Sequence, residues 1–262
     1  MFLNLAGFKI QIILQKTKHV SKKKFEKKLN KIFKGFFINE CQKIDYIVEI
    51  QERLHAGIIL NKKKDQHFSY HLKYMEEIND KYLVSYYDSF YYQIIMKHVL
   101  QKLLNKNGGL MLHASAVLFN TTAYLFLGKS GAGKSTAKGL LSKKFKPLSD
   151  DFSIVRQEKG KLYYYQTPFL EKELINNISY QRLSLKRLFF LKKSEYFSII
   201  KLDDTKIKLD ELISNSICNM YANNYERDTI ETLIKTSDKF EMYYLFFRKD
   251  KKGLIDLLED YN

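Results

Sequence analysis

Residues 128–136 read GKSGAGKST and match the pattern G-x-x-x-x-G-K-[ST] at every fixed position. Glycines permit left-handed backbone, so successive N–H groups can converge on an anion. The N-terminus of a following helix adds partial positive charge. The segment therefore predicts a nucleotide-binding loop made by Gly128, Ser130, Gly131, Ala132, Gly133, Lys134, Ser135 and Thr136. A glycine-rich turn without a ligand is the alternative, and the flanking strand and helix patterns disfavour it.

Two residues of this segment have a chemistry of their own. Lys134 is a mobile cation that can reach the outer phosphates of ATP, and the Ser135 hydroxyl is placed to bind Mg²⁺. ATP and Mg²⁺ are therefore the cofactors that we expect.

The acidic pair Asp150-Asp151 follows an apolar approach to a strand end. One carboxylate can hold a metal ion while the other accepts a proton. Acidic pairs also cap turns and solvate loops, so the dipeptide alone leaves both interpretations open. Neighbouring strand residues point to opposite faces, so only one of the two can face a site directly.

A lone histidine, His113, stands in the stretch LHAS fifteen positions before Gly128. Such a residue among apolar neighbours is usually a hydrogen-bonded core residue. It lies in an apolar strand pattern, 110–119, which a short polar turn at 120–122 joins to the strand 123–127 that precedes the loop. We expect the two strands to be sheet neighbours, so that His113 and the loop reach one site.

The elements that must position these residues can be read from apolar spacing. Strands are predicted within 1–14, at 46–50, 58–60 and 82–86, in one region that runs from 148 through 155, and at 162–165, 188–191 and 241–247. Helices are predicted at 21–33, 90–104, from 135 to the lysines before Pro147, 209–220, 229–235 and 251–259. This pattern predicts an α/β protein with a small N-terminal mixed-sheet α+β subdomain, residues 1–88, and a catalytic domain, residues 89–262.

The net charge of +16 raises the question of a nucleic-acid partner. Only six of the 45 basic residues are arginine, and lysine is accompanied by much Asn, Ile and Tyr. That bias is typical of an AT-rich genome, and base-reading motifs are absent, so nucleic acid is not the expected partner. The densest lysine run, at 22–31, is expected to be the solvated face of a helix.

The chain has no apolar stretch that approaches the length of a membrane helix. Its first residues lack the basic segment and the cleavage site of an export signal. Cys41 and Cys218 fit no metal or redox spacing. We therefore expect a cytoplasmic protein with no membrane partner.

The set LHASAV, GKSGAGKST and LSDD, in this order and spacing, resembles the catalytic domain of the HPr kinase/phosphorylase family and its smaller relatives, over about residues 108–169. Those relatives include serine kinases and peptide-modifying kinases, and the family shares its fold distantly with ATP-dependent phosphoenolpyruvate carboxykinases. The resemblance implies a P-loop core of this type. It also extends to Thr167-Pro168-Phe169, which is similar to an element that follows the acidic pair in the relatives.

The resemblance implies roles for individual residues. Lys134 matches the phosphate lysine, Ser135 the metal-binding hydroxyl, and Asp151 the catalytic aspartate that acts as general base. Asp150 then faces Mg²⁺, and His113 matches the active-site histidine. The family's second metal-binding glutamate has no clear counterpart, since Gln166, Glu171 and Glu173 all lie near the expected position. The basic, proline-containing loop of the bifunctional enzymes has no convincing counterpart either, and the first third is shorter than their regulatory domain. The sequence therefore leaves phosphorolysis, HPr as substrate and the hexamer open.

These observations predict a Mg²⁺-dependent kinase that transfers the ATP γ-phosphoryl group to a hydroxyl of a peptide, a protein or a small molecule, with serine the expected acceptor. One alternative is an ATP-binding regulatory module without turnover, against which the acidic pair and His113 argue. Another is a carboxykinase-like enzyme on a small carboxylic acid, which would need arginines near the motifs, where none stands. The sequence leaves the acceptor open, and a homo-oligomer is neither required nor excluded.

Overall fold

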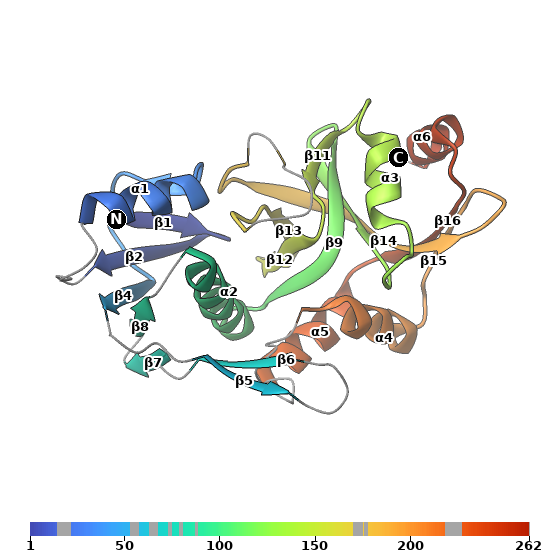
Figure 1. Cartoon of the computed structure of the whole chain (residues 1–262). Coiled ribbons are helices and arrows are strands. Elements are labelled where there is room, and N and C mark those ends of the chain that lie inside the picture. The colour runs from blue at the N-terminus through green and yellow to red at the C-terminus, as the bar shows by residue number, and fades with distance from the viewer. Residues whose placement is uncertain are drawn as a thin grey trace. The chain divides into compact units, whose positions relative to one another are not determined.

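A computed structural model of the chain describes residues 1–14, 22–52, 58–62, 68–72, 75–78, 81–86, 89–169, 175, 178–217 and 227–261. These residues form a mixed α/β structure with six helices (Figure 1). They fall into two compact units, one within residues 1–102 and the other within 103–217 and 227–261. The division lies inside helix α2 (Ser89–Lys106). The boundary between residues 88 and 89 stays a prediction.

The first unit contains a mixed sheet in the order β3-β1-β2-β4-β8-β7, in which β2–β4 and β4–β8 are parallel pairs. Its elements are β1 (Phe2–Leu5), β2 (Phe8–Leu14), α1 (Lys22–Ile32), β3 (Phe37–Ile38), β4 (Tyr46–Glu52), β7 (Met75–Ile78) and β8 (Lys81–Tyr86), with a separate hairpin of β5 (Ile58–Lys62) and β6 (Phe68–Leu72). Where the sequence indicated one opening strand, Ala6 (φ 51°) and Gly7 (φ 85°) make a left-handed turn that divides it into two.

Helix α1 confirms the solvated lysine face. Lys27, Lys28 and Lys31 are exposed, whereas Leu29 is buried. No helix in the described part of the chain is long and apolar enough to cross a bilayer.

The second unit is built on an eight-stranded sheet. Its strands are β9 (Gly109–Phe119), β10 (Thr122–Leu127), β11 (Lys146–Ser149), β12 (Phe152–Glu158), β13 (Lys161–Tyr165), β14 (Arg182–Lys193), β15 (Ser198–Lys201) and β16 (Met242–Phe247). The first residues of β14 pair with β13, and β14 also pairs in parallel with β10 and β16. Strand β15, which the sequence did not predict, is added antiparallel beside β16.

The glycine loop (Gly128–Gly133) connects β10 to helix α3 (Lys134–Leu141). Because β10, β14 and β16 run parallel, their carboxyl ends meet at one edge of the sheet, beside this loop. Ligands of open α/β sheets commonly bind outside such an edge.

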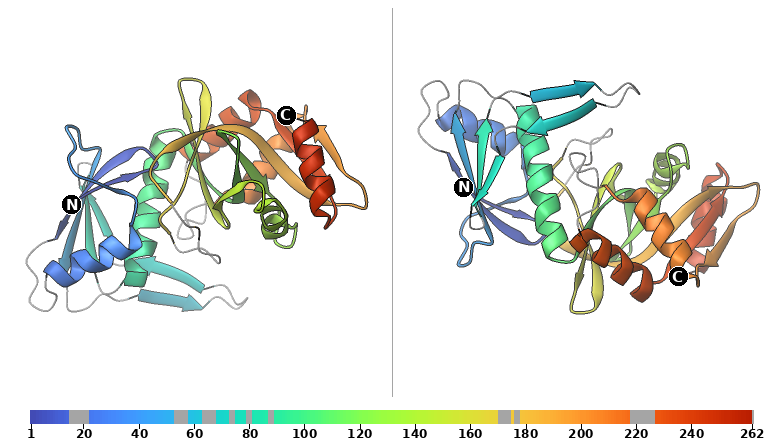
Figure 2. Two further views of the ribbon diagram at one scale, coloured as in Figure 1. Left: turned by 90° about the horizontal axis from the view of Figure 1, so that it is seen from above. Right: turned by 90° about the horizontal axis from the view of Figure 1, so that it is seen from below.

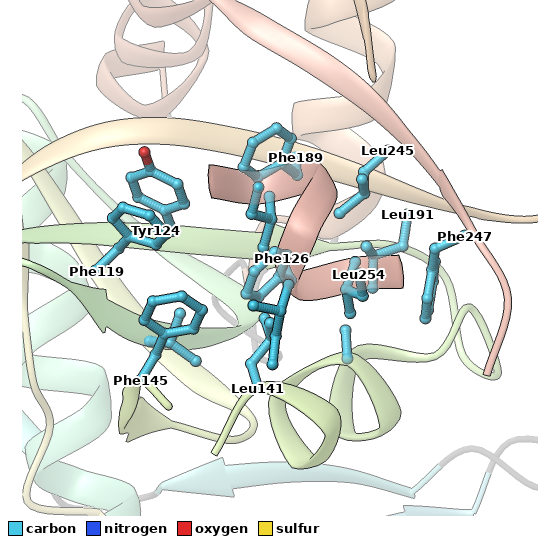
Figure 3. Packing of buried hydrophobic residues seen from close by; sticks show 14 of the residues in the cluster. Phe119, Tyr124, Phe126, Leu141, Phe145, Phe189, Leu191, Leu245, Phe247 and Leu254 are labelled. Atoms are coloured by element: carbon cyan, nitrogen blue, oxygen red, sulfur yellow. The ribbon is translucent and has the colours of Figure 1, made fainter. Parts of the chain in front are cut away.

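Two pairs of helices cover opposite faces of this sheet: α3 with α6 (Lys251–Asp260), and α4 (Thr205–Asn215) with α5 (Arg227–Lys239) (Figures 1 and 2). On the α3 face, Phe126 and Phe189 are fully buried and their rings stack 5.9 Å apart (Figure 3). Ala137 and Leu141 of α3 and Leu254 of α6 belong to the same cluster. Burying each large side chain contributes roughly 1.5–3 kcal/mol, which holds the start of α3 firmly against the sheet.

Helix α4 begins and ends earlier than the sequence indicated. The Asp204 carboxylate accepts hydrogen bonds from the N–H groups of Lys206 and Ile207 and so caps the helix at Thr205. The helix ends at Asn215, and the predicted continuation at 218–220 lies outside the described residues.

Candidate functional site

Two positions of the glycine loop, Gly128 and Gly133, have a backbone conformation and close contacts that require glycine. Gly128 has φ 153° and Gly133 has φ 103°, both in the left-handed region. A Cβ on Gly128 would lie 2.6 Å from the Cβ of Ala132, and one on Gly133 would lie 2.9 Å from Cζ of Phe247. The glycines that the pattern fixes are therefore required both by the torsion angles and by close packing.

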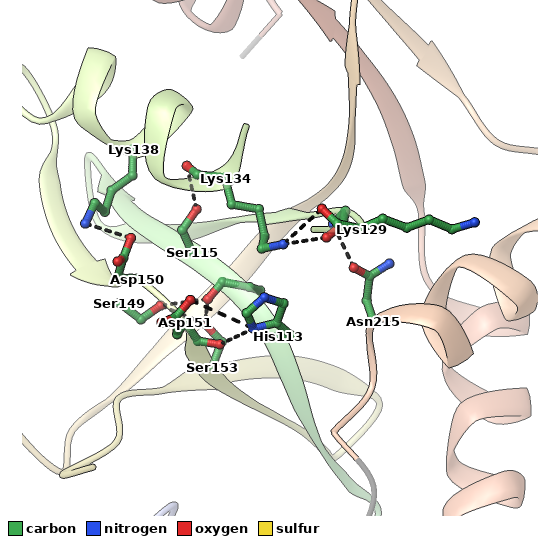
Figure 4. Close-up of polar contacts among 12 residues, drawn as sticks. His113, Ser115, Lys129, Lys134, Lys138, Ser149, Asp150, Asp151, Ser153 and Asn215 are labelled. Carbon is green, nitrogen blue, oxygen red and sulfur yellow. Dashed lines mark hydrogen bonds and ion pairs between the residues drawn. The ribbon is translucent and has the colours of Figure 1, made fainter. Parts of the chain in front are cut away.

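Lys134 lies inside the curve of this loop. Its ammonium donates hydrogen bonds to the carbonyl oxygens of Gly128 (2.5 Å) and Lys129 (3.3 Å), and the residue is 7% exposed (Figure 4). The N-cap of α3 is Gly133, which has no side chain to pair with the first N–H groups of the helix. A buried cation and uncapped helical N–H groups therefore stand together at the sheet edge.

Asn215, at the end of α4, holds the first residue of the loop. Its Oδ1 accepts a 2.7 Å hydrogen bond from the N–H of Gly128, and its Nδ2 donates to the carbonyl of Glu211 at 2.8 Å. Asn215 is 2% exposed. Sequence reasoning missed this residue, because an asparagine 87 positions away at a helix end has no local signature.

Helix α4 is itself tied to the sheet. The Glu211 carboxylate pairs with Lys192 at 2.8 Å and accepts a 3.1 Å hydrogen bond from the Tyr244 hydroxyl. Burial, followed by the bond to Glu211, raises the pKa of Tyr244 to about 12, so this hydroxyl stays a donor at neutral pH. The contacts fix α4, and with it Asn215, against the carboxyl ends of β14 and β16.

The histidine strand and the loop strand are sheet neighbours, which confirms the prediction from sequence. Strand β9 pairs antiparallel with β10, with Ala114 opposite Leu127. Ser115 Oγ donates to the carbonyl of Lys134 at 3.1 Å, so the face of β9 that carries His113 is bonded directly to the start of α3.

His113 and Asp151 lie side by side. His113 Nδ1 is 3.1 Å from the carbonyl oxygen of Asp151 and 4.0 Å from its carboxylate Oδ1. The histidine side chain is 40% exposed and that of Asp151 is 12% exposed. With Nδ1 protonated, the ring donates to the carbonyl, and this contact places the imidazole beside the Asp151 carboxylate.

Asp150 points elsewhere. Its carboxylate forms a 2.8 Å ion pair with Lys138 of α3, and both side chains are almost completely buried. The adjacent turn is held by Ser149 and Ser153, whose hydroxyls lie 2.7 Å apart. The metal role assigned to Asp150 remains a prediction, and it would require the carboxylate to be shared with, or released from, Lys138.

The other residues considered for a metal ion are placed as follows. Ser135, the second residue of α3, is exposed. Gln166 uses its amide to donate to the carbonyl of Leu148 and to accept from the N–H of Ser179. Glu171 and Glu173 lie outside the described residues. Within the described part of the chain, no three His, Cys, Asp or Glu side chains gather as a metal site.

Comparison with known proteins identifies the family. Residues 88–236 match the family described as SynChlorMet cassette protein ScmC, and this chain belongs to that family. Among solved structures, the chain is similar to the Hpr(Ser) kinase/phosphatase from Coxiella burnetii, with 11% sequence identity and a TM-score of 0.35, over 58% of this chain and 95% of that one. No curated protein sequence matches.

The buried pair Lys138–Asp150 generates a stability prediction. Replacing Lys138 with Met should leave an uncompensated buried carboxylate and lower the free energy of unfolding by about 3–5 kcal/mol. The double variant Lys138→Met, Asp150→Leu should recover most of this loss, as denaturant unfolding would measure. If the loss of unfolding free energy in the double variant equals the sum of the losses in Lys138→Met and Asp150→Leu alone, the residues do not act as a pair.

The Asn215 contact generates a second prediction. Asn215→Leu should leave the N–H of Gly128 buried without its acceptor and cost about 1–3 kcal/mol of unfolding free energy. Asn107→Leu is the matched control, because Asn107 bonds to the carbonyl of Leu103 at an exposed helix end, far along the chain from the loop. Its cost should be smaller, and equal losses in denaturant titrations would contradict the assigned role.

Proposed function

We propose that this chain is a Mg²⁺-dependent kinase that transfers the γ-phosphoryl group of ATP to a hydroxyl, of the serine type, on a peptide, a protein or a small molecule. The observation that carries the proposal is the geometry of the glycine loop. It combines left-handed Gly128 and Gly133, the ammonium of Lys134 inside the curve, and the uncapped N-terminus of α3.

This geometry suits a chain of phosphates. Backbone N–H groups of the loop and of the first turn of α3 supply donors without a side-chain rearrangement, and the helix end contributes about half a positive charge. Lys134 already points to the carbonyls at the start of the loop. It can therefore contact the outer phosphates while those two bonds keep it in place.

The acceptor hydroxyl must lose a proton as its oxygen attacks, and Asp151 is the residue that we assign to this step. The Asp151 side chain is 12% exposed, whereas that of Asp150 is 1% exposed and is engaged by Lys138. His113, beside Asp151, is placed to orient the carboxylate or to donate a hydrogen bond to a phosphate oxygen. Transfer would then depend mainly on positioning and on charge neutralisation.

Magnesium fits this site only together with a nucleotide. Three-residue clusters of metal-binding side chains are absent among the described residues, which is expected where phosphate oxygens supply several of the ligands. Exposed Ser135 would hold the ion, with a carboxylate of the acidic pair. When bound, Mg²⁺ would neutralise charge on the phosphates.

Lys134→Ala tests the phosphate contact. Loss of a charge-assisted interaction should weaken ATP binding by roughly 10- to 100-fold and abolish transfer. Lys129→Ala is the matched control within the same loop, because the side chain of Lys129 extends away from the ammonium of Lys134 (Figure 4). Its affinity should change less than about threefold by calorimetry. Equal affinity of wild type and Lys134→Ala would overturn the proposal.

Asp151→Asn separates a kinase from a module that only binds ATP. The amide is nearly isosteric but cannot accept the proton, so transfer from labelled ATP should fall roughly 10²- to 10⁴-fold while ATP affinity stays within about tenfold. The acceptor is first found by incubating a host lysate with the protein and γ-labelled ATP. Unchanged labelling by the variant would contradict the role of Asp151, and a loss of affinity instead would assign it to the metal.

A further inference from the structure

A cavity lies on the α3 side of the glycine loop, at the carboxyl ends of the parallel strands. This basic cavity has a volume of about 570 Å³, and the lining residues that matter here are Gly133, Thr136, Lys193, Phe247, Arg248 and Lys249. Its volume lies within the roughly 300–1,000 Å³ of small-molecule sites. The ring of Phe247 packs directly against Gly133, so the cavity adjoins the last glycine of the loop.

Three basic residues against one acidic residue, Glu195, give this cavity a positive charge that favours an anionic ligand. Lys193 and Lys249 are exposed at the ends of β14 and β16. The Arg248 guanidinium donates to the carbonyl of Glu195 at 3.3 Å, lies 3.7 Å from the Asp250 carboxylate, and has one face over the Phe197 ring, 5.4 Å from its centroid. A guanidinium fixed in this way can stack on an aromatic base, which a lysine ammonium does less well.

The order of the strands gives a direction to a bound nucleotide. Asp151 and His113 belong to the side of β10 occupied by β9 and β12, whereas β14 and β16 lie on the other side. If the terminal phosphate lies near Asp151, the rest of the nucleotide must extend across β10 toward β14 and β16. Thr136, in the first turn of α3, lines the basic cavity and stands on that path.

Another cavity, of about 660 Å³, adjoins the same loop on the α4 side. Its charged lining residues are Lys129, Lys192, Lys193, Asp210 and Glu211, and Lys192 is already paired with Glu211. Two carboxylates next to a chain of phosphates would repel it. Because Lys193 lines both cavities, the choice rests on Thr136 and on the planar guanidinium of Arg248, which belong only to the basic cavity.

We propose that the basic cavity binds the nucleoside and the adjoining phosphate of the donor nucleotide, with Arg248 against the base and Lys193 near the phosphate. This inference rests on the proposed function, since it assumes a phosphate chain in the glycine loop. It assigns base recognition to residues that the sequence motifs did not mark.

The test compares ATP with inorganic tripolyphosphate, which lacks the nucleoside, both with Mg²⁺. Arg248→Ala should weaken ATP binding by about 5- to 30-fold and leave tripolyphosphate within about twofold. Arg248→Lys, which keeps the charge but loses the planar group, should not restore ATP affinity. Asp210→Ala, in the α4-side cavity, should change the affinity for neither ATP nor tripolyphosphate. The contact with the base would be overturned if Arg248→Lys had the ATP affinity of wild type, or if Arg248→Ala weakened the binding of ATP and tripolyphosphate equally.

Photolabelling with 8-azido-ATP locates the base independently of any variant. Label should fall on residues 194–195 or 247–249, because Lys193 lines both cavities and does not distinguish them. Label at 207–214 would place the base in the α4-side cavity and overturn the inference while leaving the kinase proposal intact. If wild type binds neither ATP nor tripolyphosphate, the proposed function itself fails, and the inference fails with it.

Discussion

The left-handed backbone at Gly128 and Gly133 is the constraint on which the rest of the candidate site depends. Such torsion angles are accessible to glycine but leave the chain flexible, so the loop needs outside contacts to keep one shape. Those contacts come from distant parts of the chain: Asn215 bonds the N–H of Gly128, Phe247 packs on Gly133, and Ser115 bonds the start of α3. The loop is thus shaped by the second unit as a whole rather than by its own sequence.

The fold gives the two carboxylates of the acidic pair different surroundings. Asp150 turns toward α3 and is neutralised by Lys138, which joins the strand end to the helix behind the loop. Asp151 remains beside His113, and its side chain is 12% exposed. A buried pair of this kind contributes little net stability but makes the loss of either partner costly. The ion pair between Lys138 and Asp150 therefore fixes the position of Asp151, the next residue along the chain.

Much of the second unit could be predicted from the sequence, because its strands and helices have strong periodicity and clear stop signals. The pairing of β9 with β10 followed from the short turn at 120–122. Contacts made by side chains across the fold could not be predicted: Asn215 lies 87 positions from Gly128, and Lys138 reads as an ordinary helix lysine. The choice of Asp151 over Asp150 as the general base came from the family resemblance and stays a prediction. Helix α4 was misplaced because Asp204, its cap, was not recognised.

The central claim is that the N–H groups of the glycine loop bind a phosphate chain, and amide hydrogen exchange with and without Mg·ATP tests it most directly. Exchange in residues 128–136 should slow strongly when ATP is added, because N–H groups of this segment would donate to phosphate oxygens. The N–H groups of Gly128 and Ala132 are excepted, since they already bond to Asn215 and to the carbonyl of Lys129. Exchange in exposed α1 should not change. If ATP leaves the exchange of residues 128–136 unaltered at saturating concentration, the loop does not hold the nucleotide and the account is wrong.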